Sequence, residues 1–208
     1  MKDFTLIVND AIRTQLTHHV GRHWMIDELT VGDVEDMSPF IPENVSQVVD
    51  LCCGSGRVSI ALDKLVFGGR AKFWLVDGNV NAEVENIKRH WDKYHNDRIA
   101  RFYNRRDLTE ECCRLNGFTN YEYIEVDENL GWSKLPTDVD FLFSNRGIGC
   151  HWPLAIYENL FPKILADGAT CIFMNGEVLG RIPEYFTEVA VVDEKIQDRS
   201  LIVLRYAA

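Results

Sequence analysis

The feature that most constrains the fold is the segment 48–62, where an apolar run, a turn of small residues and a helix start follow one another. The run Val48-Val49-Asp50-Leu51 predicts a buried strand that ends near a carboxylate. The run Cys52-Cys53-Gly54-Ser55-Gly56-Arg57 predicts a tight turn, and Val58-Ser59-Ile60-Ala61-Leu62 can open a helix. Small residues let a ligand approach the backbone closely, and the free N–H groups of a first helical turn point towards it. A nucleotide-like ligand is therefore expected at this turn.

Strand-like and helix-like segments alternate along the rest of the chain, which predicts a mostly parallel sheet covered by helices on both faces. The seven expected strands are Gln47–Leu51, Ala71–Val76, Tyr121–Val126, Val139–Ser144, Ala169–Asn175, Phe186–Asp193 and Ser200–Tyr206. The expected helices of this α/β core are Arg57–Val66, Ala82–His95, Leu108–Leu115 and Leu154–Leu165. Too few residues join the last two strands for a crossover helix, so they should form an antiparallel hairpin.

A chain of 208 residues suits a single domain, in which residues 46–208 form the α/β core. Residues 1–45 are expected to be a helical cap over the site, with helices near 10–20 and 22–30. Pro39 and Pro42 should break the chain before the first strand.

Composition restricts the partners and the compartment. The net charge of −10 gives no global positive field, which disfavours a nucleic-acid partner and leaves a small-molecule substrate. No apolar run approaches the ~20 residues of a membrane span, and residues 1–6 lack a signal-peptide pattern, so a cytoplasmic protein is expected. The six cysteines lack zinc spacing and are expected to be free buried thiols. His19 and His23 have no evident third ligand, so no metal is expected.

Three acidic residues follow the first three expected strands of the core. Asp50 is at the end of the first strand, Asp77 directly follows the second, and Asp127 follows the third. The carboxyl ends of parallel strands meet at one edge of an open sheet, where ligands bind. Asp77 also follows Gly56 by roughly the 20 residues expected of an acid that binds ribose hydroxyls. A capping or solvated role for each carboxylate is the structural alternative.

The turn resembles the signature of class I S-adenosylmethionine-dependent methyltransferases, D/E-x-G-x-G-x-G, because it reads Asp50-Leu51-Cys52-Cys53-Gly54-Ser55-Gly56. The resemblance implies a Rossmann-like seven-stranded fold over residues 45–206 and S-adenosyl-L-methionine as the cofactor. Cys52 departs from the signature, since it stands at the first glycine position. The cofactor residues that the resemblance implies are Asp50, Cys52, Gly54 and Gly56 of the turn, Asp77 and Gly78 at the ribose, Asp127 at the adenine, and Asn145 under the sulfonium.

An NAD site is the weaker alternative. The run from Gly54 to Ser59 nearly fits G-x-G-x-x-G, but Ser59 stands in the third place. A carboxylate at the opening of the turn also suits a cationic cofactor better than a pyrophosphate.

The loop that follows the strand Val139–Ser144 is expected to carry the chemistry, because two glycines and Pro153 shape it. His151 can accept a proton at neutral pH and is the candidate base for an oxygen acceptor. The loop also resembles a segment of some sugar O-methyltransferases. The candidate substrate-binding residues are Arg22, His23, Trp24, Arg146 and Trp152.

The sequence therefore predicts methyl transfer to an oxygen of a small, sugar-like molecule. Ser144-Asn145-Arg146-Gly147 lacks the Asn/Asp-Pro-Pro-Tyr/Phe motif of many amino-directed enzymes, and no cysteine follows a proline as in cytosine-C5 enzymes. Two alternatives stay open: an N-methyltransferase that acts on a protein or nucleotide, and a cofactor-binding module without catalysis.

Overall fold

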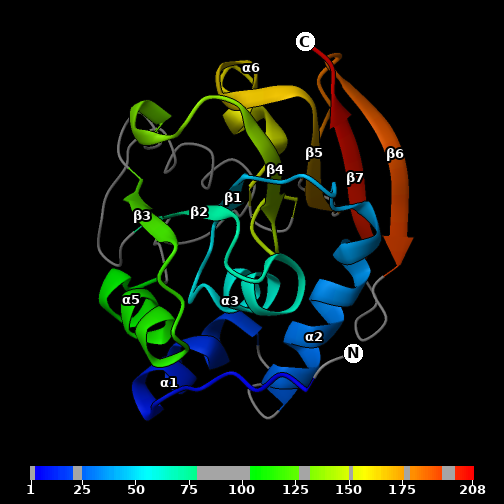
Figure 1. Cartoon of the computed structure of the whole chain (residues 1–208). Coiled ribbons are helices and arrows are strands. Elements are labelled where there is room, and N and C mark those ends of the chain that lie inside the picture. Colours follow the sequence, from blue (N-terminus) through cyan, green and yellow to red (C-terminus); the bar gives the residue numbers. More distant parts are fainter. Residues whose placement is uncertain are drawn as a thin grey trace, which may run out of the picture.

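The computed structural model describes residues 3–20, 25–78, 104–126, 132–149, 152–175, 179–193 and 200–208, and its elements are drawn in Figure 1. The strands are β1 (Gln47–Leu51), β2 (Lys72–Asp77), β3 (Tyr121–Glu125), β4 (Val139–Ser144), β5 (Leu165–Asn175), β6 (Phe186–Asp193) and β7 (Ser200–Tyr206). The α-helices are α1 (Asp10–Val20), α2 (Ile26–Met37), α3 (Arg57–Leu62), α5 (Arg106–Leu115) and α6 (Phe161–Ile164). A π-helical turn at Asp63–Phe67 extends α3, and short 3-10 turns lie at Ser38–Phe40, Trp132–Lys134 and Leu154–Tyr157.

The seven strands form one sheet in the order β3-β2-β1-β4-β5-β7-β6. β1 pairs in parallel with β2 and β4, β2 with β3, and β4 with β5. β7 is antiparallel to both β5 and β6, so the last two strands form the predicted hairpin beside β5 (Figure 1). The predicted fold class, a mostly parallel seven-stranded sheet with a C-terminal antiparallel hairpin, is confirmed.

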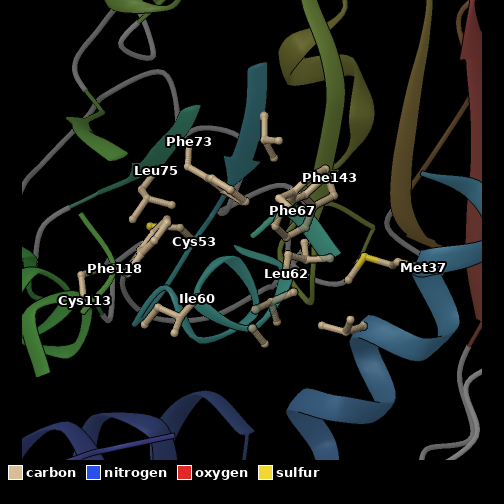
Figure 2. Close-up of a cluster of buried hydrophobic side chains, with 14 of the residues drawn as sticks. Met37, Cys53, Ile60, Leu62, Phe67, Phe73, Leu75, Cys113, Phe118 and Phe143 are labelled. Carbon is tan, nitrogen blue, oxygen red and sulfur yellow. The ribbon is translucent and has the colours of Figure 1, made fainter. Parts of the chain in front are cut away.

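Each face of the sheet is covered by its own hydrophobic core. The α6-side core includes Val49, Leu142 and Phe161, and the α3-side core includes Val48 and Phe141. Consecutive residues of β1 and β4 therefore enter opposite cores, as the two-residue period of a strand requires. Figure 2 shows the α3-side core, with side chains from α2, α3, α5, β2, β4 and the turns that follow β1, α3 and α5. Its labelled members are Met37, Cys53, Ile60, Leu62, Phe67, Phe73, Leu75, Cys113, Phe118 and Phe143.

The N-terminal segment adds two helices to the α3 side of the sheet. Ile12 and Leu16 of α1 and Val34 and Met37 of α2 enter the α3-side core. Side-chain hydrogen bonds fasten this segment as well, because the Asn116 Oδ1 accepts from the Ile7 N–H at 2.9 Å. That residues 1–45 cap the site stays a prediction.

The predicted helix near 22–30 is wrong in its bounds, since α2 runs from Ile26 to Met37. Gly32, Asp33 and Asp36 have low intrinsic helix propensity. All three are buried in the structure, and tertiary contacts of Asp33 override the local preference. Helix formation in proteins depends mainly on such packing.

The predicted helix Leu154–Leu165 is also wrong in part, since a 3-10 turn and the single turn α6 replace it. Pro162 accounts for the break, because its ring lacks an N–H and clashes with the carbonyl four residues earlier. β5 begins at Leu165, but its regular pairing with β4 starts only at Thr170, close to the predicted strand start.

None of the helices in the described part of the chain is long and apolar enough to cross a membrane. The five cysteines that the structure describes are free, as predicted.

Candidate functional site

The ends of β1, β2 and β3 lie side by side at one edge of the sheet. Leu51 pairs with Val76, and Asp77 pairs with Glu125, so the residues that follow each strand emerge together. In open α/β sheets this edge is where ligands bind.

The turn after β1 is compact because three of its residues have left-handed backbone angles. Cys52, Gly54 and Gly56 have φ of 63°, 55° and 73°. The N–H groups of Cys52 and Cys53 both donate to the Val76 carbonyl, at 2.8 and 3.1 Å, which ties the turn to the end of β2. Gly56 is the N-cap of α3, where its positive φ turns the chain into the helix.

Asp77 joins the turn to the end of β2 through its carboxylate. One oxygen accepts from the Gly54 N–H at 2.7 Å, and the other accepts from the Gly78 N–H at 2.7 Å. Burial raises the pKa of Asp77 to about 7, and the two backbone donors oppose that shift. A carboxylate offers about four lone-pair positions, and two of those of Asp77 have no donor among the described residues.

Asp50 is placed differently from Asp77. It is 2% exposed, and its carboxylate accepts from the Ser59 hydroxyl of α3 at 2.7 Å. The strand period explains this direction, because Asp50 shares the α3-side face of β1 with Val48. Burial raises the pKa of Asp50 to about 8, and the neighbouring Asp77 charge adds to the shift. Asp50 thus stabilises the turn from the α3 side of the sheet, through its hydrogen bond with Ser59.

A small pocket opens at the ends of β1 to β3. It holds about 280 Å³ of empty space, part of which is open to solvent. Its walls combine one carboxylate with mostly apolar and aromatic side chains, which is the usual composition of a small-molecule site. The lining residues are Cys52, Val76, Asp77, Gly78, Val126, Trp152, Ile156 and Tyr157.

Cys52 fits its unusual position because Gly147 lies against it. A Cβ on Gly147 would meet the Cys52 Cβ at 2.4 Å and the Ser144 Oγ at 2.7 Å. The Ser144 hydroxyl is itself engaged, since it donates to the Leu51 carbonyl at 2.7 Å and accepts from the Ile148 N–H at 2.9 Å. The loop after β4 is thus fitted to the cysteine that replaces the first glycine of the signature.

Asn145 and Arg146 lie at the end of β4 and bind Asp33 of α2. The Asn145 Nδ2 donates to one carboxylate oxygen at 2.7 Å, and the Arg146 guanidinium contacts the other at 2.8 Å. Arg57, the first residue of α3, forms a salt bridge to the same carboxylate at 2.5 Å and donates to the Thr30 hydroxyl at 3.0 Å. These four charged or amide groups form the Asp33 hub (Asp33, Arg57, Asn145 and Arg146).

The structure brings together some of the predicted site residues and separates others. The pocket is lined by four of them, Cys52, Asp77, Gly78 and Trp152. The Gly54 N–H donates a hydrogen bond to one of these, Asp77. Asp50 and Gly56 support the turn, whereas Asn145 and Arg146 belong to the Asp33 hub. The remaining predicted site residues lie outside the described part of the chain; they are Arg22, His23, Trp24, Asp127 and His151.

Sequence reasoning missed Asp33, Val126, Ile156 and Tyr157. Val126 directly precedes Asp127, and Ile156 and Tyr157 follow Trp152 by one helical turn, so their proximity to predicted residues was a usable signal. Asp33 gave no such signal, because its partners lie in distant parts of the sequence.

Solved structures share this architecture. A structure described as an S-adenosylmethionine-dependent methyltransferase from Aquifex aeolicus is similar with a TM-score of 0.60 and 15% identity, over 95% of this chain and 98% of that one. The chain has the fold of the S-adenosylmethionine-dependent methyltransferases. Fibrillarin from Aeropyrum pernix, with natively bound S-adenosyl-L-methionine, is similar with a TM-score of 0.55 and 15% identity, over 84% of this chain and 73% of that one.

The likeness lies in the fold and not in the sequence. No protein-family model matches the chain, and no curated protein does. The methyltransferase fold nevertheless confirms the architecture that the turn and the strand–helix alternation predicted.

Proposed function

We propose that this chain transfers a methyl group from S-adenosyl-L-methionine to an oxygen of a small, sugar-like acceptor. The observation that carries the proposal is the Asp77 carboxylate in the wall of an apolar pocket, at the ligand-binding edge of a methyltransferase fold. The net charge of −10 supports a small-molecule acceptor over a nucleic acid.

The described residues fit an adenosyl group. The two free lone-pair positions of Asp77 can accept hydrogen bonds from the two ribose hydroxyls. Val126, Ile156 and Trp152 offer apolar surface to a flat aromatic base. Asp127 directly follows Val126, so a role for its carboxylate at the adenine amino group agrees with the position of its neighbour.

The turn after β1 would hold the methionine portion. Gly54 and Gly56 let a ligand approach the backbone, as the resemblance implies for this turn. Cys52 lines the pocket with a thiol where the signature has a glycine. Burial raises the pKa of Cys52 well above its ordinary value.

When bound, the cofactor supplies a methyl group on a positively charged sulfur. The chain has to exclude water, orient the acceptor and take the proton that the acceptor oxygen loses. His151 is the proposed base, and it precedes Trp152, which lines the pocket. Arg22, His23, Trp24 and Arg146 are the proposed substrate-binding residues, with Asn145 at the methyl end.

Calorimetric titration with S-adenosylhomocysteine tests the cofactor site. The unmodified protein should bind, and Asp77→Asn should weaken binding by about 100-fold, because two hydrogen bonds to a charged group are lost or reversed. Glu122→Gln, which changes an exposed acid on β3, is the matched control and should bind normally. Absence of binding to the unmodified protein at millimolar ligand would refute the proposal.

Product mass analysis with labelled cofactor tests the acceptor. An oxygen acceptor predicts that His151→Ala lowers kcat by ~10²–10⁴-fold, the usual contribution of a general base. A neutral amine acceptor depends less on that base, so an unchanged kcat would favour the N-methyltransferase. Tight cofactor binding without turnover in any extract would favour the binding module.

A further inference from the structure

Four buried polar side chains from separate segments form a connected set, which we call the polar bridge. Its members are Gln15 of α1, Asn104 just before α5, Thr109 of α5 and Tyr123 of β3. Their exposures are 6%, 2%, 0% and 8%, so each lies inside the protein. The bridge lies outside the pocket, and none of its members belongs to the turn after β1.

Direct hydrogen bonds connect Gln15, Asn104 and Tyr123, and Thr109 packs against Asn104. The Gln15 Nε2 donates to the Asn104 Oδ1 at 2.6 Å, and the Asn104 Nδ2 donates to the Tyr123 hydroxyl at 3.1 Å. The Thr109 Oγ1 lies 3.2 Å from the Asn104 Oδ1 and packs against it, because its one proton goes to the Gly54 carbonyl at the shorter distance of 2.7 Å. The Gln15 Oε1 also accepts from the Arg105 N–H at 3.2 Å, so both ends of its amide are used.

The polar bridge ends on two particular backbone carbonyls. Thr109 donates to the Gly54 carbonyl at 2.7 Å, and the Tyr123 hydroxyl lies 3.4 Å from the Gly78 carbonyl. Gly54 and Gly78 are also the two residues whose N–H groups donate to Asp77. The same pair of glycines is thus held by the bridge on one side and by the carboxylate on the other.

Stability alone gives no reason for this arrangement. Burying polar groups costs free energy that their hydrogen bonds only offset, and apolar residues of similar shape can be equally stable. A fully satisfied buried network instead restricts the groups at its ends to one geometry.

We propose that the polar bridge is a set of positioning residues, which orient Gly54 and Gly78 so that the free lone pairs of Asp77 face the ribose hydroxyls of the cofactor. This inference rests on the proposed function and adds a means by which α1 contributes to cofactor affinity at a distance. Gln15 does not line the pocket, yet it holds the Asn104 amide, which donates to Tyr123 at the Gly78 end of the bridge and packs against the Thr109 hydroxyl at the Gly54 end.

Thr109→Val is the sharpest test, because it keeps the shape of the side chain and removes the hydroxyl. The probes are S-adenosylhomocysteine and its 2′-deoxy analogue, titrated calorimetrically. We expect Thr109→Val to lower affinity for the first by about tenfold, the size of one buried hydrogen bond, and to change affinity for the 2′-deoxy analogue far less. The ratio of the two affinities, which measures the preference for the ribose 2′-hydroxyl, should therefore fall by a similar factor.

Two control variants accompany this test. Thr109→Ser restores the hydroxyl and should restore the preference for the ribose hydroxyl. Thr170→Val removes another fully buried threonine hydroxyl, whose oxygen has no hydrogen-bond partner among the described residues, and should leave both affinities unchanged. If Thr109→Val does not fold, Tyr123→Phe removes the hydroxyl at the other end and should give the same selective loss.

Three outcomes would overturn the inference. Unchanged affinity and preference in a folded Thr109→Val protein would remove the bridge from the site. Equal losses for both ligands would reduce Thr109 to a structural role. Failure of the unmodified protein to bind either ligand would instead refute the proposed function, and the inference with it.

Discussion

The two ends of the site are built in opposite ways. At the β2 end, Asp77 accepts from two backbone N–H groups and keeps lone pairs for a ligand. At the β4 end, the Asp33 carboxylate binds two guanidinium groups and the Asn145 amide nitrogen, all from within the protein. The β2 end is therefore arranged to receive hydrogen-bond donors, whereas the β4 end is arranged to hold α2, α3 and a loop together.

This difference determines what a substitution at each end should change. Removing Asp77 should affect ligand affinity much more than stability, because its burial as a charge is unfavourable for folding. Removing Asp33 should affect stability much more than ligand affinity.

The largest expected effect is on the stability of an Asp33→Ala variant. The substitution takes the shared carboxylate away from Arg57 and Arg146, whose side chains are only 7% and 10% exposed. Breaking a buried ion pair in this way costs about 3–5 kcal/mol of the free energy of unfolding. Urea denaturation measures the loss, with Glu43→Ala as an exposed control. A loss below about 1 kcal/mol would show that the hub does not anchor the β4 end.

A smaller effect is expected where the two ends touch, at Cys52 and Gly147. Gly147→Ala places a methyl group 2.4 Å from the Cys52 Cβ and should lower the free energy of unfolding by about 1–3 kcal/mol. Combining it with Cys52→Gly should recover part of that loss, because the closest contact disappears. A double-mutant cycle measures this coupling, and purely additive effects would contradict the fit between the two residues.

The remaining prediction is a pH dependence at Asp50, for which we state only a lower bound. Its pKa is raised from 3.8 to about 8 in the folded protein, so the folded state favours the neutral carboxyl. The stability that this provides is complete below about pH 4 and is lost as the pH rises towards 8. The Asp50→Asn side chain stays neutral at every pH. As the pH rises from 5 to 9, the free energy of unfolding of this variant should therefore increase by at least about 1 kcal/mol relative to that of the unmodified protein.

Thermal unfolding at several pH values checks this prediction. Glu122→Gln on the exposed face of β3 is the control, since it changes the net charge equally without altering a buried group. A constant difference between Asp50→Asn and the unmodified protein at all pH values would contradict it.

The same contrast explains what the sequence could predict. Asp77 was found because the strand end, the following turn and the spacing from Gly56 are local features. Cys52 was recognised as a departure from the signature, but its partner Gly147 could not be, since the contact depends on how the loop after β4 packs.

The β4 end could not be predicted for a related reason. Asn145 and Arg146 were singled out as ligand-binding residues, yet their partner Asp33 lies 112 and 113 positions away. Only the folded arrangement brings α2 to that loop. The polar bridge is hidden in the same way, because Gln15 and Asn104 are 89 positions apart.

The strand order has a consequence for synthesis on the ribosome. β1 lies between β2 and β4, and Val48 pairs with Phe141, so the middle of the sheet cannot close until the second half of the chain has emerged. Until then the nascent chain presents the unpaired β4-side edge of the apolar strand β1 to its surroundings, which is a state prone to association with other chains. Cotranslational protection by chaperones would therefore be needed most before β4 leaves the exit tunnel.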